Sequence, residues 1–338
     1  MLVVGWSFTS QCNLRCIHCY NASGKPHHDE LTHEQALHVA KKLIAYNVDA
    51  VNFGGGECPL RKDFFEICNL LHDAGIKLSL TTNGLTYKST AKHLSLFYDI
   101  GVSIDFADAR KHDAFRGLKG AYAKAVEAIK FFVSQGVNTE IVTCITKLNC
   151  NEKELRKLHS LAKELGVNFW RLNRYKPLGR EGHRDFLKLS PDDVKKAYAY
   201  LSRLTGKLAK DFTVPDPLFA LMGNQVNTCP CGTTSFRIQP NGEVTPCIYL
   251  KVTGGNILDK SIGEIMSSEI FMAIRNRDLT GTKCESCNLK ESCKGGCAGA
   301  AYAEHGSFNY PDPSCWVNPR WNVHEKYLCT VYVPMKRM

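Results

Sequence analysis

The segment CNLRCIHCY, residues 12–20, places three cysteines within eight positions, directly after the β-rich run VVGWSFT at residues 3–9. Structural zinc takes four protein ligands, and a zinc site with three protein ligands leaves its fourth position to water or substrate. Iron–sulfur clusters are normally held by four thiolates, so three thiolates on a four-iron cube leave one iron open to a small molecule. The segment therefore predicts a zinc loop or an open-iron cluster, and chance clustering of thiols is the remaining alternative.

The composition sets the outer limits of the function. The 338 residues are 44% hydrophobic and 22% charged, which suits one large globular domain with a smaller one. The net charge of +10 is spread along the chain without basic runs, so we expect no nucleic-acid partner; it indicates acidic substrates or has no functional meaning. We find no secretory signal and no run of about 18 apolar residues, and we expect a cytoplasmic protein without membrane attachment. In a reducing compartment, so many cysteines are expected to bind metal rather than to form disulfides, and this applies to the eleven that cluster near the N-terminus and in the last third. The five isolated ones, Cys58, Cys68, Cys144, Cys150 and Cys329, are expected to be small buried side chains.

Up to about residue 205, short β-rich runs alternate with segments of helical periodicity. The predicted strands are residues 3–9, 50–53, 77–82, 101–106, 139–145 and 168–172. One predicted helix begins after Thr32, where Gln35 completes a capping box, and another begins after Ser190 in the segment SPDD. Six β/α units predict a parallel sheet, arranged as a partial barrel or as an open doubly wound sheet, with chemistry at the carboxyl ends of the strands.

After about residue 206 the alternation ends. The proline-containing segment DFTVPDPLF (211–219) reads as a connection, and from Gln225 the chain is rich in cysteine and glycine. The run SFRIQPNGEVTPCIYL (235–250) predicts a hairpin with its turn at Asn241-Gly242. Such a region cannot build a large apolar core, so we expect bound metal to stabilise it.

The three-cysteine segment resembles the CxxxCxxC signature of the radical S-adenosylmethionine (radical SAM) enzymes. In that family the open iron chelates the amino and carboxylate groups of S-adenosylmethionine (SAM), whose one-electron cleavage gives a 5′-deoxyadenosyl radical that abstracts hydrogen from the substrate. Here the resemblance assigns Cys12, Cys16 and Cys19 to a [4Fe-4S] cluster. It also implies that the α/β fold is a partial (β/α)6 TIM-like barrel.

Further positions extend the resemblance to the SAM site. FGGGECP (53–59) is similar to the family's GGE motif, which would place the methionine moiety at Gly55, Gly56 and Glu57. TTNG (81–84) and SIDFADARKHDAFRG (103–117) resemble segments that end the third and fourth strands, although Phe106 stands where glycine is usual. Turn chemistry at strand ends is the alternative for Asn83 and Asp105. The cofactor-binding residues that the resemblance adds are His18, Tyr20, Asn83, Ser103 and Arg116.

The C-terminal cysteines resemble the SPASM domain, an extension of many radical SAM enzymes that holds two auxiliary four-iron clusters. By position, the first cluster would take Cys231, Cys247 and Cys297, with Cys229 as a possible fourth ligand, and the second Cys284, Cys287, Cys293 and Cys315. A zinc ribbon is the alternative. We predict a radical SAM partial barrel at 1–205, a linker at 206–225, a SPASM domain at 226–320 and a C-terminal tail at 321–338.

The resemblance implies a reaction type more than a substrate. We expect a radical oxidoreductase or maturase with three [4Fe-4S] clusters, supplied with electrons by a flavodoxin or ferredoxin and acting on a peptide. Radical chemistry on a small molecule such as a sugar, nucleoside or tetrapyrrole is the alternative, and a zinc-stapled binding protein is the non-enzymatic one. Candidate acid/base or hydrogen-donor residues are Cys58, Asp105 and Tyr302, with Arg174 and His305 as further candidates. For the basic segment RLNRYKPLGREG (171–182) we expect either binding of a carboxylate or phosphate on the substrate or a solvated loop.

Overall fold

One sheet organises the molecule. The computed structural model describes residues 1–180, 185–208, 212–223 and 229–318, so the predicted tail at 321–338 lies outside the described residues. Its strands are β1 (Val3–Thr9), β2 (Ala50–Gly55), β3 (Lys77–Thr82), β4 (Asp99–Ser103), β5 (Thr139–Ile145), β6 (Phe169–Arg174), β7 (Phe212–Thr213), β8 (Ser235–Ile238), β9 (Glu243–Thr245) and β10 (Gly255–Asn256). They form a ten-stranded sheet in the order β10-β9-β8-β1-β2-β3-β4-β5-β6-β7. The sheet does not close between β7 and β10, so the fold is a partial barrel.

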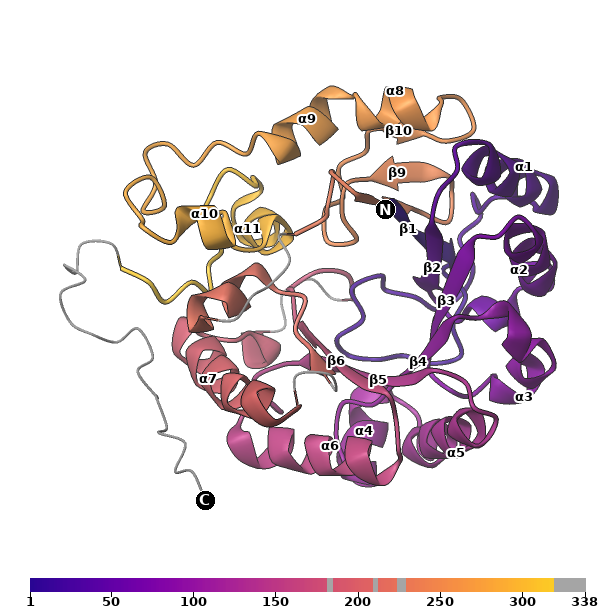
Figure 1. The fold of residues 1–338 in the computed structure, drawn as a ribbon, viewed down its shortest axis with the longest axis horizontal. Helices are drawn as coiled ribbons and strands as arrows, with labels where there is room; N and C mark the ends of the chain where they lie inside the picture. Colours follow the sequence, from indigo (N-terminus) through magenta and orange to yellow (C-terminus); the bar gives the residue numbers. More distant parts are fainter. Residues whose placement is uncertain (181–184, 209–211, 224–228, 319–338) are drawn as a thin grey trace, which may run out of the picture.

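Helices cover the outer face of the curved sheet (Figure 1). The α-helices are α1 (His33–Ala45), α2 (Phe64–Asp73), α3 (Tyr87–Thr90), α4 (Ala109–Arg116), α5 (Ala121–Ser134), α6 (Glu152–Glu164), α7 (Pro191–Leu208), α8 (Ile262–Met266), α9 (Glu269–Arg275), α10 (Lys290–Cys293) and α11 (Ala298–His305). Short 3₁₀ helices are η1 (Cys58–Leu60), η2 (Ala91–Leu96), η3 (Asp185–Leu187) and η4 (Pro217–Met222). The predicted domain boundary at residue 205 lies within α7.

Alternation along the strands separates the core from the barrel interior. Trp6 and Phe53 are fully buried on the outer face of β1 and β2, where their rings stack at 5.7 Å. Their sequence neighbours Gly5, Asn52 and Gly54 face the inside of the barrel and line a cavity. A TIM-type barrel is normally filled with bulky side chains, so these small inward residues leave room for a ligand.

Several local predictions are confirmed. Thr32 caps α1 with Gln35 in a capping box, and the hydroxyl of Ser190 accepts a hydrogen bond from Asp193 at the start of α7. The fourth strand differs from its predicted range of 101–106. β4 ends at Ser103, because the backbone N–H of Asp105 donates to Nδ1 of His112 at 3.2 Å and no longer takes part in the sheet.

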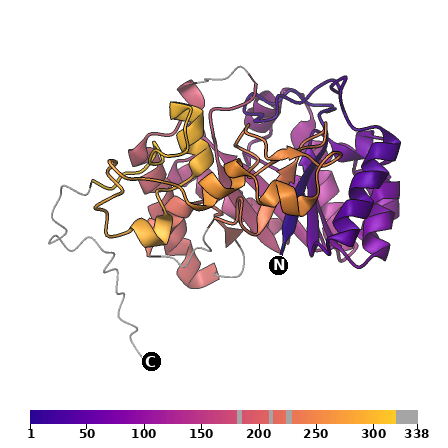
Figure 2. The same ribbon diagram turned by 90° about the horizontal axis from the view of Figure 1, so that it is seen from above.

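The C-terminal third continues the barrel sheet. β8 pairs in parallel with β1, and β9 returns antiparallel to β8 across the predicted hairpin turn. In Figure 1 the orange and yellow segments lie across the open side of the barrel between α1 and α7, and Figure 2 shows α10 and α11 on the side opposite α1 and α2. Within the described ranges, no helix is long and apolar enough to cross a membrane.

Candidate functional site

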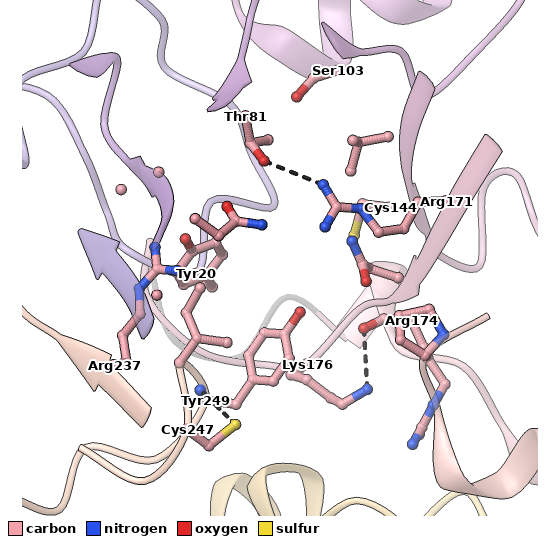
Figure 3. Close-up of a pocket in the computed structure, with 18 of the residues that line it drawn as sticks. Tyr20, Thr81, Ser103, Cys144, Arg171, Arg174, Lys176, Arg237, Cys247 and Tyr249 are labelled. Atoms are coloured by element: carbon pink, nitrogen blue, oxygen red, sulfur yellow. Dashed lines mark hydrogen bonds between the residues drawn. The ribbon is translucent and has the colours of Figure 1, made fainter. Parts of the chain in front are cut away.

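The barrel interior holds a cavity of about 1060 Å³. It is lined by residues from β1–β8, by the three-cysteine loop and by part of the cysteine-rich region. Its volume lies near the upper end of the range for ligand sites, which gives room for a cofactor together with a substrate. Figure 3 shows side chains from distant parts of the chain converging on it.

The loop with Cys12, Cys16 and Cys19 is fixed by backbone hydrogen bonds. The N–H of Cys12 donates to the carbonyl of Gly24 at 2.8 Å, and Arg180 donates from its backbone N–H to the carbonyl of Cys19 at 2.9 Å. The Arg180 side chain also donates to the carbonyl of Cys16 at 3.0 Å. The basic segment that follows β6 therefore holds this loop, in addition to lining the cavity.

The three sulfurs have the surroundings that thiolates need. Each accepts an N–H: Cys12 from Leu14 at 3.4 Å, Cys19 from Ser23 at 3.4 Å and Cys16 from the guanidinium of Arg116 at 3.8 Å. Without a metal, burial raises the pKa of the Cys12 thiol to about 11 and also raises the pKa of Cys16. A bound cluster would reverse this preference, because metal coordination deprotonates a thiol. The donor set thus fits an iron–sulfur cluster.

No set of three or more His, Cys, Asp or Glu side chains in the described ranges converges on the position of a single metal ion. A four-iron cube binds one thiolate at each ligated corner, so its cysteines need not meet at one point.

The GGE segment approaches the cysteine loop closely. A Cβ atom on Gly56 would lie 2.0 Å from the carbonyl oxygen of Gln11, and Gly55 has a φ of +112°. Glu57 is 1% exposed, and its carboxylate accepts hydrogen bonds from the hydroxyls of Thr82 and Thr86 and from the N–H of Asn83. Burial raises the pKa of Glu57, and these three donors oppose that rise.

The other expected cofactor residues gather at the same edge of the sheet. Asn83 donates to Asn13 at 2.7 Å and reaches the sulfur of Cys12 at 3.9 Å. His18 stacks on Phe115 with ring centroids 4.2 Å apart, and burial lowers the pKa of His18 to about 3, so its ring is neutral at pH 7. Tyr20, Ser103 and Arg116 also line the cavity.

Arg116 forms a buried ion pair with Asp105, with Nε 2.7 Å from the carboxylate. Burial alone would raise the pKa of Asp105, but Arg116, followed by His18 and His112, holds it below its usual range. The Asp105 carboxylate also accepts the N–H of Cys144 at 2.8 Å. Asp105 thus fixes the guanidinium that donates to Cys16, and it is not among the residues that line the cavity.

The C-terminal cysteines lie in two separate groups. The thiol of Cys231 is close enough to Cys229 and Cys247 for these groups to raise its pKa, and the thiol of Cys297 is close enough to Cys247 for the two to interact electrostatically. A separate small pocket is lined by the second group, Cys284, Cys287, Cys293 and Cys315. Only the first group also borders the large cavity, through Cys229, Cys231 and Cys247.

Of the remaining candidate residues, Cys58, Tyr302 and His305 do not line the large cavity, whereas Arg174 does. Cys58 is fully buried in the apolar core, and its thiol donates to the carbonyl of Gly54 at 3.2 Å. Tyr302 packs in the cluster around Cys247, and the ring of His305 contacts Tyr310. Arg174 is buried between Asp216 and Asp312. Catalytic roles for Cys58, Asp105 and Tyr302 stay predictions.

Sequence reasoning missed Arg237 and Tyr249, and it gave Lys176 no role of its own. Lys176 lies 5.3 Å from the centre of the Tyr249 ring, and Tyr249 contacts Tyr20 edge to face at 5.8 Å. Arg237 is on the inner face of β8. Alternation within SFRI shows that Arg237 and Phe236 face opposite sides of the strand, but nothing local in the sequence indicates that β8 pairs with β1.

Two family models match the chain: the Radical SAM superfamily at residues 6–162 and an iron–sulfur cluster-binding domain, SPASM, at residues 229–294. The chain is 30% identical to the AdoMet-dependent heme synthase of Methanosarcina barkeri (strain Fusaro / DSM 804), over 94% of this chain and 97% of that protein. It is 32% identical to the mycofactocin maturase MftC of Mycolicibacterium smegmatis, over 92% and 81% of the two chains. Its fold is similar to that of Streptococcus suis SuiB bound to S-adenosylmethionine, with a TM-score of 0.75 and 19% identity over 94% and 77% of the two chains. The chain therefore belongs to the radical SAM superfamily and carries a C-terminal SPASM domain, so it is an enzyme that uses S-adenosylmethionine and iron–sulfur clusters.

Proposed function

We propose that this enzyme binds three [4Fe-4S] clusters and SAM, and that it crosslinks, oxidises or epimerises a peptide during maturation. The observation that supports this most is the shared cavity: the loop with Cys12, Cys16 and Cys19 borders the same space as Cys231 and Cys247. When bound, the cluster at the first loop supplies the electron that cleaves SAM. A substrate in the cavity would then lie between that loop and the first auxiliary group.

The chain's own residues would orient SAM. Ser103 and Arg116 border the cavity where a carboxylate group could be held, and Asp105 keeps the Arg116 guanidinium in place at 2.7 Å. The neutral ring of His18 and the phenol of Tyr20 provide flat surfaces for the adenine. Glu57 braces Asn83, which reaches toward Cys12.

A peptide is favoured because the 32% identical relative is a maturase. The alternative is a tetrapyrrole, supported by the heme synthase that this chain matches over 97% of its length. In either case the auxiliary groups would transfer electrons, and we expect a flavodoxin or ferredoxin as donor. The domain ranges 1–205, 206–225 and 226–320 are part of the same proposal.

The proposal is tested on anaerobically reconstituted protein with dithionite and SAM. We expect 5′-deoxyadenosine to form, and about twelve irons per chain if all three cysteine groups hold four-iron clusters. The Cys12→Ala, Cys16→Ala, Cys19→Ala variant should retain about eight irons and form no 5′-deoxyadenosine. Product formation by that variant, or stoichiometric zinc in place of iron, would contradict the proposal.

A further inference from the structure

The cavity has a strongly cationic lining. Within the described ranges it is bordered by five basic side chains and by one carboxylate, that of Glu57, whose oxygens already accept three hydrogen bonds. The basic side chains are Arg116, Arg171, Arg174, Lys176 and Arg237. A concave surface with one sign of charge and low-dielectric walls concentrates ligands of the opposite charge.

Four of these cations have an acidic partner. Arg116 pairs with Asp105; Arg174 pairs with Asp216 and Asp312, and Lys176 lies 3.3 Å from Asp216. Arg171 pairs with Glu140 at 2.5 Å, although its buried Nε has no hydrogen-bond partner.

Arg237 has no acidic partner among the residues that the structure describes, although it is only 8% exposed. Its Nε donates to the hydroxyl of Ser7 at 2.9 Å, which fixes the plane of the guanidinium, and the Arg237 side chain lines the cavity. A buried charge is normally paired, because its desolvation is otherwise uncompensated.

Two glycines make room for this guanidinium. A Cβ on Gly5 would lie 2.6 Å from one terminal nitrogen of Arg237, and a Cβ on Gly54 would lie 3.2 Å from the other. Most side chains in these positions would displace the group from the barrel wall. The small residues of β1 and β2 therefore provide the space that the guanidinium on β8 occupies.

Strand register locates Arg237 along the wall of the cavity in which the substrate would bind. It pairs in register with Gly5, while Cys231 bridges to Ser235 at the start of the same strand and Cys12 follows the end of β1. Arg237 therefore lies along the wall between the loop that contains Cys12 and the first C-terminal group, which contains Cys231. Figure 3 shows Arg237 and Arg171 extending into the cavity from opposite sides, with Tyr20 beside Arg237.

We propose that Arg237, assisted by Arg171 from the opposite wall, binds a carboxylate of the substrate. A guanidinium offers two parallel N–H donors that match a carboxylate, so it would fix the orientation of the neighbouring carbon atoms as well as the charge. The inference rests on the proposed function and narrows its substrate class to molecules with a carboxylate within the cavity. That carboxylate belongs to a peptide or to a small organic acid.

The test is calorimetric titration of the SAM-loaded, reconstituted holoenzyme. The probes are succinate and acetyl-Ala-Ala, each compared with its amide. We expect saturable binding of at least one carboxylate, no binding of the amides, and about ten- to hundredfold weaker binding to Arg237→Gln. Arg237→Lys should recover part of the loss, and Arg156→Gln, a change on the exposed face of α6, should bind like the wild type. Tighter binding of the peptide acid would identify a peptide carboxylate, and tighter binding of succinate a small acid.

Two further measurements separate the possible failures. The dissociation constant for SAM should be the same in Arg237→Gln and wild type; a tenfold weakening would assign this guanidinium to the cofactor and overturn the inference. Carboxylate binding that is absent, or that Arg237→Gln leaves within twofold, would also overturn it. If Arg237→Gln does not fold, Ser7→Ala removes the orienting hydrogen bond instead and should weaken binding several-fold. Wild-type protein that binds the carboxylate but forms no 5′-deoxyadenosine would contradict the proposed function alone.

Discussion

The buried carboxylate of Glu57 connects the end of β2 to the loop after β3. It receives two threonine hydroxyls on one oxygen and the N–H of Asn83 on the other, at 2.9 Å for the N–H. Asn83 in turn donates to Asn13 and reaches Cys12. Glu57→Gln should therefore disturb both the stability of the barrel and the three-cysteine loop.

The size of the effect follows from these contacts. The substituted side chain keeps one oxygen, which can accept both hydroxyls, but it turns an amide NH₂ toward the N–H of Asn83. Two buried donors then face each other, at a cost of about 1–3 kcal/mol for the unsatisfied N–H. Relief of the desolvation that raises the pKa of Glu57 offsets part of this loss. We expect a net loss of about 1–2 kcal/mol, or roughly 1–3 °C in Tm for a chain of this length.

Thermal unfolding of the apo protein by circular dichroism measures the first effect, and iron content with SAM affinity measures the second. Glu66→Gln is the matched control, since the same charge is removed from a side chain that is 60% exposed on α2. A Tm equal to that of the control would refute the bracing role. If the Tm is unchanged while SAM affinity falls, Glu57 contacts the cofactor directly.

Three further substitutions test other parts of the site. Gly179→Ala would place a Cβ 2.3 Å from the carbonyl of Cys19 and should reduce iron at the first loop, whereas Gly75→Ala, also at positive φ but in open space, should keep it; equal iron in both would be contrary evidence. Asp105→Asn should cost about 3–5 kcal/mol, because it leaves a buried guanidinium unpaired. The pKa of Asp105 is lowered in the fold, so its stabilisation is present above the ordinary value of 3.8 and is lost as the pH falls further. In urea unfolding, the free energy of unfolding of Asp105→Asn should lack the fall at acid pH that this carboxylate contributes in the wild type. An equal pH dependence in the two proteins would contradict the pairing. Asp312→Asn removes the carboxylate charge from the side chain that accepts the N–H of Cys297 at 3.0 Å. The electron paramagnetic resonance spectrum of this variant should lose the signal of one auxiliary cluster and keep the signal of the cluster at the first loop.

Local sequence signals predicted the barrel well. The bounds of β1, β3 and β5 agree with the predicted runs, because each run is followed by a polar residue and carries apolar side chains on its buried face. The capping box at Thr32 is a purely local interaction and was therefore readable. The early end of β4 could not be predicted in this way. It depends on His112, seven residues after Asp105, which accepts the backbone N–H of Asp105 and so removes that N–H from the sheet.

The missed parts of the site depend on contacts between distant segments. Arg237 and Ser7 are 230 positions apart, and Arg174 and Asp312 are 138 apart. No periodicity or motif in either segment encodes such pairs. Glu57 was found through its motif, yet its three hydrogen-bond donors became visible only when β3 was placed beside β2.

The pairing of β8 with β1 explains why these long-range contacts share one site. A SPASM region joined only by a linker would let the distance between its cysteines and the first loop vary. Here Cys231 is fixed to β8 through its bridge to Ser235, and Cys12 follows β1, the neighbouring strand. Strand register therefore sets the length of the cavity between the first loop and the Cys231 group. Arg237, which pairs with Gly5, occupies a fixed position along that length. For this reason, a substrate carboxylate held at Arg237 would keep a constant position relative to both groups throughout the reaction.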